Sequence, residues 1–269
     1  MAGSRDRTFR TVDLARAALA HENTVRIYVE WGFLARPERA PNGYRLWNRD
    51  HLDQMVFARR ALHGEWPGRR IRESALALVR LAATGALDDA LAASRSHAEL
   101  VRDERRRAEE AAAFLDAWAS ADLAPSLSDG ADAAAGPAED GRLGPREAAE
   151  AVGATMDQVR NWERNRLLDP PRDAAGRRSY GRHELGRLRV IRALLLAGYS
   201  VMAILRMTTE LDRGRTAGLR EILDTPRRGE EVLTAFDRWL TSLALQEARA
   251  AELTALLEAR SSRRASDRR

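Results

Sequence analysis

The chain has 269 residues, of which 44% are hydrophobic and 32% are charged, a composition typical of a globular protein with room for two ordinary domains. It contains no cysteine, which excludes disulfides, thiolate metal sites and cysteine nucleophiles. No apolar run is long enough to span a membrane and the N-terminus lacks the apolar core of a secretory signal, so we expect a cytoplasmic protein with no membrane partner.

The formal net charge is +5, and every basic residue is an arginine. The planar guanidinium binds phosphate through two parallel hydrogen bonds, which suits a nucleic-acid partner. A codon bias that replaces lysine by arginine gives the same composition. The positions of the arginines therefore matter more than the net charge.

Residues 8–83 have the pattern of a winged helix-turn-helix domain. A helix that begins near Thr11 is followed by a short turn and a second helix over residues 24–31, which Gly32 ends. Asn42-Gly43 is a strong hairpin signal and predicts a small pair of strands, the wing. Two further helices are expected after the wing, and a helix without glycine or proline is expected over residues 88–118.

Residues 119–141 are small and acidic, with several prolines and glycines, and predict a flexible linker. A second module follows over residues 143–212, with its recognition helix at about 157–165. A second long helix is expected over residues 230–260, where apolar residues alternate at spacings of four and three, as in a coiled coil. The basic tail, 261–269, is expected to be disordered.

The second module repeats the first. Arg160 follows Arg26 at an offset of 134 residues, and Gly176 follows Gly43 at an offset of 133. The slip of one residue falls in the hairpin loop, where deletions are tolerated. We therefore predict an all-α fold with two small β wings, in which each winged module is followed by a long helix.

The first module carries Thr-Val-Arg-Ile-Tyr at residues 24–28 and Gly-Tyr-Arg-Leu-Trp at 43–47. The second carries Val-Arg-Asn-Trp-Glu at 159–163, a wing at 176–180 and Gly-Tyr-Ser at 198–200. With these motifs both modules resemble the DNA-binding domain of the MerR family of bacterial transcription regulators. The first module departs from the family at Val29, where a glutamate is usual, and the second at Arg166, which stands where the first has Gly32.

The resemblance implies that the protein binds double-stranded promoter DNA, distorts the spacer between promoter elements and acts with RNA polymerase, as an activator or a repressor. Family members carry one module and pair through an antiparallel coiled coil. We expect residues 88–118 and 230–260 to pair within one chain and to imitate that dimer, although an ordinary homodimer is the alternative. Family metal sensors use cysteines, which this chain lacks.

Arginines on the two recognition helices and wings are the predicted DNA contacts, because arginine reads guanine in the major groove or holds phosphate. Tyr28 and Trp162 are candidates for the sugar–phosphate, with a core position as the equal alternative. The candidate DNA-binding residues are Thr24, Arg26, Tyr28, Arg39, Tyr44, Arg45, Arg59, Gln158, Arg160, Trp162, Arg172, Arg177, Arg178 and Arg192.

No acid–base pair or phosphate loop is evident, so we expect neither an enzyme nor a cofactor or metal. The alternative is a protein that sequesters a small molecule, such as a drug, in a helical pocket lined by Trp66, Trp118 and Trp239. A regulator with a small-molecule effector is also compatible with the sequence.

Overall fold

The computed structural model describes residues 8–64, 66, 68–123, 142–226 and 237–266. These residues are mainly helical, and their two strands form one small antiparallel sheet, so the predicted all-α class with small wings is confirmed. The chain divides into two compact units, one made of the residues up to Asp103 with those from Leu243 onward, the other of Glu104–Ser242. No helix of the described residues is long and apolar enough to cross a membrane.

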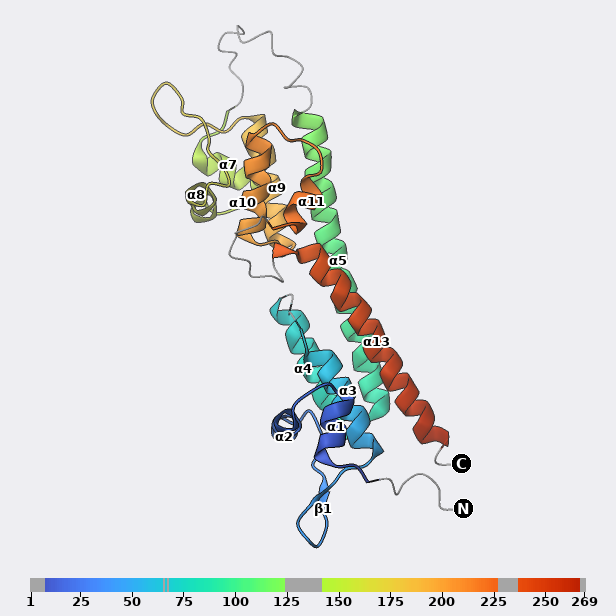
Figure 1. Cartoon of the computed structure of the whole chain (residues 1–269). Helices are drawn as coiled ribbons and strands as arrows, with labels where there is room; N and C mark the ends of the chain where they lie inside the picture. The colour runs from blue at the N-terminus through green and yellow to red at the C-terminus, as the bar shows by residue number, and fades with distance from the viewer. Residues whose placement is uncertain (1–7, 65, 67, 124–141, 227–236, 267–269) are drawn as a thin grey trace. The chain divides into compact units, whose positions relative to one another are not determined.

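The first unit begins with the predicted helix-turn-helix and wing (Figure 1). Its strands pair Glu38 with Leu46 and Arg39 with Arg45, and a further bridge joins Phe9 to Trp47. The elements in order are α1 (Thr11–Ala17), α2 (Glu22–Glu30), β1 (Glu38–Arg39), β2 (Arg45–Leu46), α3 (Arg49–Leu62) and α4 (Arg69–Thr84).

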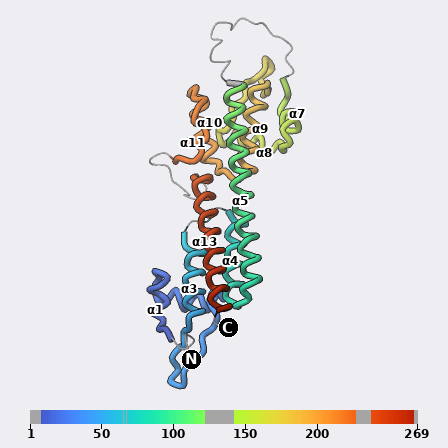
Figure 2. The backbone as a smooth tube through the Cα atoms, turned by 90° about the vertical axis from the view of Figure 1, so that its right-hand side faces the viewer, coloured from blue at the N-terminus to red at the C-terminus, as the bar shows by residue number. Residues whose placement is uncertain are grey.

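Two long helices, α5 (Leu87–Trp118) and α13 (Trp239–Ser266), each contribute to both units. In the first unit the start of α5 and the end of α13 lie side by side and run in opposite directions (Figures 1 and 2). The buried hydroxyl of Ser94 lies 2.5 Å from that of Thr254, so a residue that interrupts the apolar stripe of α5 is satisfied by the partner helix. The predicted stripe of α13 is buried from Trp239 to Leu257, and residues 230–236 lie outside the described residues.

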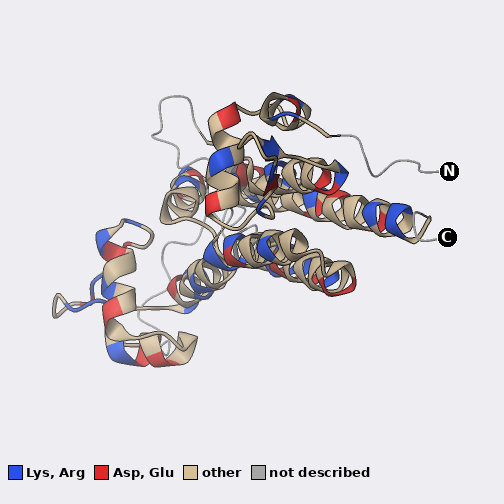
Figure 3. Cartoon of the chain, turned by 90° about the horizontal axis from the view of Figure 1, so that it is seen from below, with Lys and Arg blue, Asp and Glu red and all other residues tan. Residues whose placement is uncertain are grey.

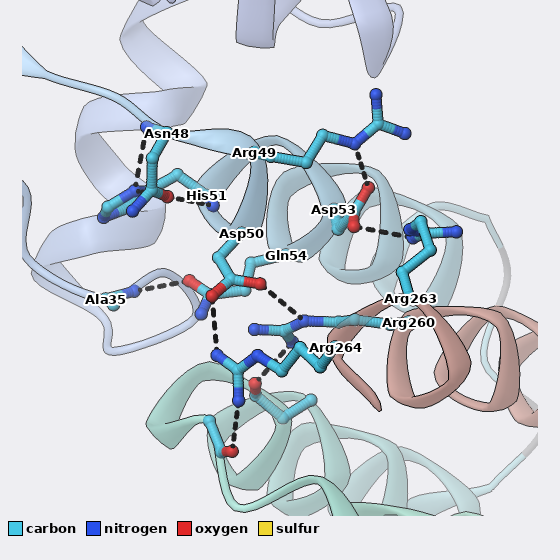
Figure 4. A network of polar contacts seen from close by, with 12 residues as sticks. Ala35, Asn48, Arg49, Asp50, His51, Asp53, Gln54, Arg260, Arg263 and Arg264 are labelled. Carbon is cyan, nitrogen blue, oxygen red and sulfur yellow. Dashed lines mark hydrogen bonds and ion pairs between the residues drawn. The ribbon is translucent and has the colours of Figure 1, made fainter. Parts of the chain in front are cut away.

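The C-terminal end of α13 is ordered, contrary to the prediction of a disordered tail from residue 261, and the helix continues to Ser266. Arg264 holds Asp50 at the start of α3 with a distance of 2.6 Å from Nη2 to Oδ2, and Arg263 holds Asp53 at 2.6 Å (Figure 4). These partners lie about two hundred positions away in the sequence, which is why the local composition of the tail was misleading.

Arg260 is the buried member of this network, with 3% of its surface exposed. Its Nη1 donates to the Ala82 carbonyl at 2.9 Å, and its Nε lies 3.5 Å from Asp50 Oδ1. Burial raises the pKa of Asp50, but the hydrogen bond from Arg264 and the charges of both arginines outweigh burial and hold that pKa below its usual value. The network thus fixes α13 to α3 and α4.

The second unit carries the second module (Figure 1). The first residues of the predicted linker continue α5 as a π-helix, η1 (Ala119–Leu123), whereas residues 124–141 lie outside the described residues. The elements that follow are α7 (Pro145–Val152), α8 (Met156–Arg164), α9 (Arg182–Leu196), α10 (Val201–Asp212) and α11 (Leu219–Asp224).

The second wing closes through isolated bridges rather than through strands. Arg172 pairs with Arg178, and Leu143 pairs with Tyr180 as Phe9 pairs with Trp47 in the first module. Pro171, which matches Glu38 of the first wing, accepts from the Ser179 N–H at 2.9 Å but has no N–H to donate in return, so no regular ladder forms there. The expected second β wing is therefore a hairpin of the same outline with fewer backbone bonds.

Candidate nucleic-acid interface

The recognition helices α2 and α8 each bury one face and expose an arginine on the other. Val25 on α2 and Val159 on α8 are fully buried, which turns the following residues, Arg26 and Arg160, toward solvent. Arg160 forms an ion pair with Asp157 at 3.5 Å, but both side chains are exposed, so the pair is weak. Both arginines remain accessible to an anionic partner.

Two aromatic candidates are core residues. Tyr28 packs edge-on against Phe33, with ring centroids 5.5 Å apart, and is 6% exposed, while Trp162 is 5% exposed. Each lies three positions after the buried valine of its helix, which places it on the same inward face. Both rings therefore occupy core positions, the alternative that the sequence left open, and contact of their polar atoms with the sugar–phosphate remains a prediction.

Two polar candidates lie at the start of the recognition helices. Gln158 closes a capping box, because its Oε1 accepts from the Thr155 N–H at 2.8 Å while its own N–H donates to Thr155 Oγ1 at 3.1 Å. Thr24 is half-buried on α2. Gln158 thus has a structural role in addition to any contact with DNA.

The wings place arginines directly opposite each other, Arg39 across from Arg45 in the first module and Arg172 across from Arg178 in the second. In each wing the leading arginine donates from Nη1 to a glycine carbonyl, Arg39 to Gly43 at 3.1 Å and Arg172 to Gly176 at 2.8 Å. These bonds hold the hairpin turn and leave the guanidinium at the wing. Elsewhere basic and acidic residues are interspersed along the helices (Figure 3).

The tips of the wings differ between the modules. Tyr44 of the first wing is 75% exposed, and Arg177 occupies its place in the second wing. Asp173 accepts from the Arg177 N–H at 2.8 Å, and its carboxylate lies 3.0 Å from Arg177 Nε. The backbone hydrogen bond from Arg177 lowers the pKa of Asp173, and the Arg177 charge adds to the effect. Arg177 therefore helps to close its own turn.

Arg59 and Arg192 lie away from the wing arginines in the described contacts. Arg59 lines a hollow between α1, α3 and α13, and Arg192 lies against Gly153 at the turn after α7. Their matched positions on α3 and α9 are real, but the structure brings neither together with the recognition-helix arginines. Contact with phosphate by these two residues remains a prediction.

In the second module α8 and the wing enclose a hollow of about 830 Å³. It gathers Arg160, Arg172 and Arg178 from the predicted set and adds Arg164 and Arg166, which the sequence reasoning missed. Arg164 lies one helical turn after Arg160, a spacing that would have placed it on the same face. Acidic residues also line the hollow, so its charge is mixed.

Sequence reasoning also missed two buried polar side chains that form hydrogen bonds to the backbone between each recognition helix and its wing. Gln54 on α3 accepts from the Ala35 N–H at 2.8 Å, at the base of the first wing. Arg187, at the matched position on α9, donates from Nε to the Leu167 carbonyl at 2.8 Å and pairs with Asp212. Each fixes the segment that joins the recognition helix to its wing.

The described residues include no group of three or more histidine, aspartate or glutamate side chains placed to hold a metal ion. Among the tryptophans suggested for a drug pocket, Trp118 stacks on His183, with ring centroids 5.5 Å apart, and Trp239 donates from Nε1 to the Ala197 carbonyl at 2.8 Å. Both are buried in packing within the second unit.

The segment from α7 to α10 carries the helix-turn-helix, the wing and the hollow. Residues 145–211 match the MerR HTH family of regulatory proteins. The match covers the MerR-type helix-turn-helix, wing and following helices of the second module. No curated protein and no solved structure matches the chain. A MerR-type domain is a DNA-binding domain of transcription regulators, which agrees with the exposed arginines of α8 and its wing.

Proposed function

We propose that the chain is a sequence-specific transcription regulator of the MerR type that binds promoter DNA with two winged helix-turn-helix modules. The family match supports this for residues 145–211. The observation that carries it for both modules is the repeated placement of one exposed arginine on the recognition helix beside a wing with two facing arginines.

Facing like charges in a hairpin destabilise it unless an anion lies between them. Arg39 and Arg45 form such a pair in the first wing, whereas in the second wing Arg178, which faces Arg172, already pairs with Glu163 on α8. A phosphate of the DNA backbone would neutralise the pair of the first wing and accept its hydrogen bonds. The arrangement therefore favours a polyanionic partner over a neutral one.

Matched backbone features support a common origin of the two modules. Gly32 and Arg166, 134 positions apart, both have positive φ, at 74° and 59°, after their recognition helices. Leu19 and Gly153, also 134 positions apart, have positive φ at 50° and 66° after the preceding helices. Residues other than glycine rarely adopt a positive φ. Its recurrence at matched positions therefore favours a duplicated module in which both copies follow the same backbone path.

One chain then provides the two DNA-binding modules that a family dimer provides with two chains. In the first unit the antiparallel packing of α5 on α13 joins segments of the same chain, as the pseudo-dimer requires (Figure 2). The two recognition helices differ at equivalent positions: Thr24 of the first corresponds to Gln158 of the second, and Val29 corresponds to Glu163. The operator is therefore an imperfect palindrome with unlike half-sites. Distortion of the promoter spacer, with RNA polymerase as partner, completes the proposed mechanism for activation or repression.

Binding to duplexes from the region upstream of the gene, measured by fluorescence anisotropy across a salt series, tests the function. A specific duplex should bind with an affinity that falls steeply as salt rises, because each neutralised phosphate releases a counterion. Light scattering on the complex should give one 30.0 kDa chain per operator. Two chains per operator would contradict the pseudo-dimer, and the absence of any preferred duplex at low salt would contradict the function.

A further inference from the structure

A second hollow lies wholly within the first unit, between the turn after α1, helix α3 and helix α13. Its volume is about 720 Å³, within the range of pockets that hold small organic molecules. Its walls are largely apolar, formed by small and aliphatic side chains. These are Ala17, Ala18, Leu19, Val56, Ala255 and Leu256.

The charged groups in this hollow leave a positive excess. Arg59, Arg60 and Arg249 line it, and Glu252 is the one acid among the described lining residues. Arg60 pairs with Glu252 and neutralises it. The Nη1 of Arg249 is buried without a hydrogen-bond partner in the described structure, so this guanidinium has a donor to spare. Burial lowers the pKa of Arg249, and the Arg60 charge acts in the same direction.

Leu19 at the wall of the hollow is unusual in two respects. Its φ is +50°, in the left-handed region that a branched side chain rarely adopts, and 88% of its surface is exposed. The matched position in the second module is Gly153, which adopts this conformation without strain. Strained backbone of this kind is concentrated at ligand sites, and the exposed side chain adds apolar surface at the edge of the hollow.

The matched position in the second module is built differently. Arg192, which corresponds to Arg59, lies against Gly153, where a Cβ would be 3.5 Å from its Nη2, an ordinary van der Waals distance. The strained leucine is therefore specific to the first module.

We propose that this hollow binds a small organic anion with an apolar, aromatic body and a single carboxylate or sulfonate group. The apolar walls would cover the body, and the positive charges of Arg59 and Arg249, which line the hollow, would bind the acidic group. Such a molecule would contact both the helix-turn-helix and α13. The inference goes beyond the proposed regulation of transcription and does not depend on DNA binding.

The test is a fluorescence titration of the full chain with two dyes of similar shape. 8-Anilinonaphthalene-1-sulfonate carries the anionic group, and N-phenyl-1-naphthylamine has the same rings without it. The sulfonate should bind one molecule per chain and at least tenfold more tightly than the neutral dye. Equal affinity of the two dyes would overturn the assignment of an anion site.

Two variants locate the site. Ala255→Trp fills the hollow and should weaken sulfonate binding at least tenfold, whereas Ala113→Trp, on the exposed part of α5, should leave it unchanged. Arg249→Met should weaken the sulfonate about tenfold and the neutral dye little. Circular dichroism checks that each variant folds, and if Arg249→Met does not, the Ala255→Trp result still decides. Unchanged binding by Ala255→Trp would place the dye elsewhere and overturn the proposal.

Discussion

Glu163 on the recognition helix α8 holds two side chains of the second wing. The Tyr180 hydroxyl donates to Oε1 at 2.5 Å, and Arg178 Nε lies 2.8 Å from Oε2. Glu163 is the glutamate that the family resemblance places after the aromatic residue, and its match in the first module is Val29. The second wing is therefore fixed to its recognition helix through a carboxylate, and the first module lacks this group.

The hydrogen bond between Tyr180 and Glu163 should contribute to stability. Tyr180→Phe removes the donor and leaves the carboxylate with Arg178 alone, so the free energy of unfolding should fall by about 1 kcal/mol. Urea unfolding followed by circular dichroism measures the change. Tyr44→Phe is the matched control, since its ring is 75% exposed and should show no loss. Equal losses in both variants would contradict the role of Glu163.

Alkaline pH should destabilise the protein through two buried tyrosines. Burial raises the pKa of Tyr180, with Glu163 adding to the effect, and burial likewise raises the pKa of Tyr199. A tyrosine in the unfolded chain titrates near pH ~10. The stability from these groups is therefore complete below that pH and falls as pH rises above it. Unfolding free energies from pH 8 to 11 should decline more steeply for the native chain than for a Tyr180→Phe, Tyr199→Phe double variant; parallel curves would contradict this.

The junction between α13 and α3 should depend on pH in the opposite direction. Asp50→Asn removes the charge that pairs with Arg260 and Arg264, and should lower the free energy of unfolding by roughly 1–3 kcal/mol at pH 7. The folded pKa of Asp50 lies below the unfolded value of 3.8, so this stability is present above pH 3.8 and is lost as pH falls below it. Denaturant unfolding should show a larger loss from Asp50→Asn at pH 7 than at pH 3.

Asp53→Asn is the control for that measurement, because its partners Arg49 and Arg263 are largely exposed. Its effect should stay below about 1 kcal/mol. A loss as large as that of Asp50→Asn would mean that the buried Arg260 does not set the strength of the junction.

Arg166 should be less favourable than glycine at its position. Its φ of +59° is costly for a side chain, whereas Gly32 adopts +74° at the matched place in the first module. Arg166→Gly should raise the free energy of unfolding by about 0.5–1 kcal/mol after the larger entropy of unfolded glycine is offset. Gly32→Ala should lower it by about 1 kcal/mol. Thermal unfolding compares the two variants, and shifts of the same sign would contradict the shared backbone.

Much of the fold could be predicted from local sequence. The period of apolar residues located the helices, and Asn42-Gly43 located the turn of the first wing, because these signals act over a few residues. The helical tail could not be predicted, since Arg263 and Arg264 depend on Asp53 and Asp50 in a distant segment. The composition of the tail alone does not show that acidic partners lie elsewhere in the chain.

The site was predicted in part for a similar reason. Arg26 and Arg160 directly follow buried valines, and the helical period places both in solvent. The same periodicity places Tyr28 and Trp162 on the inward face, but an aromatic residue with a polar tip suits both environments and its type alone does not decide. Gln54 and Arg187 were missed because their partners are backbone groups in loops, which have no sequence signature.

The most direct test of the account compares single and double arginine variants on one operator duplex. Arg26→Ala and Arg160→Ala should each cost about 1–3 kcal/mol of binding free energy, and the double variant about their sum, since each module contacts its own half-site. Arg102→Ala removes the same charge from α5, outside the two winged modules, and should cost little. Fluorescence anisotropy at fixed salt gives the affinities of the native chain and of the four variants. A loss for Arg160→Ala with none for Arg26→Ala would contradict the claim that both modules bind DNA.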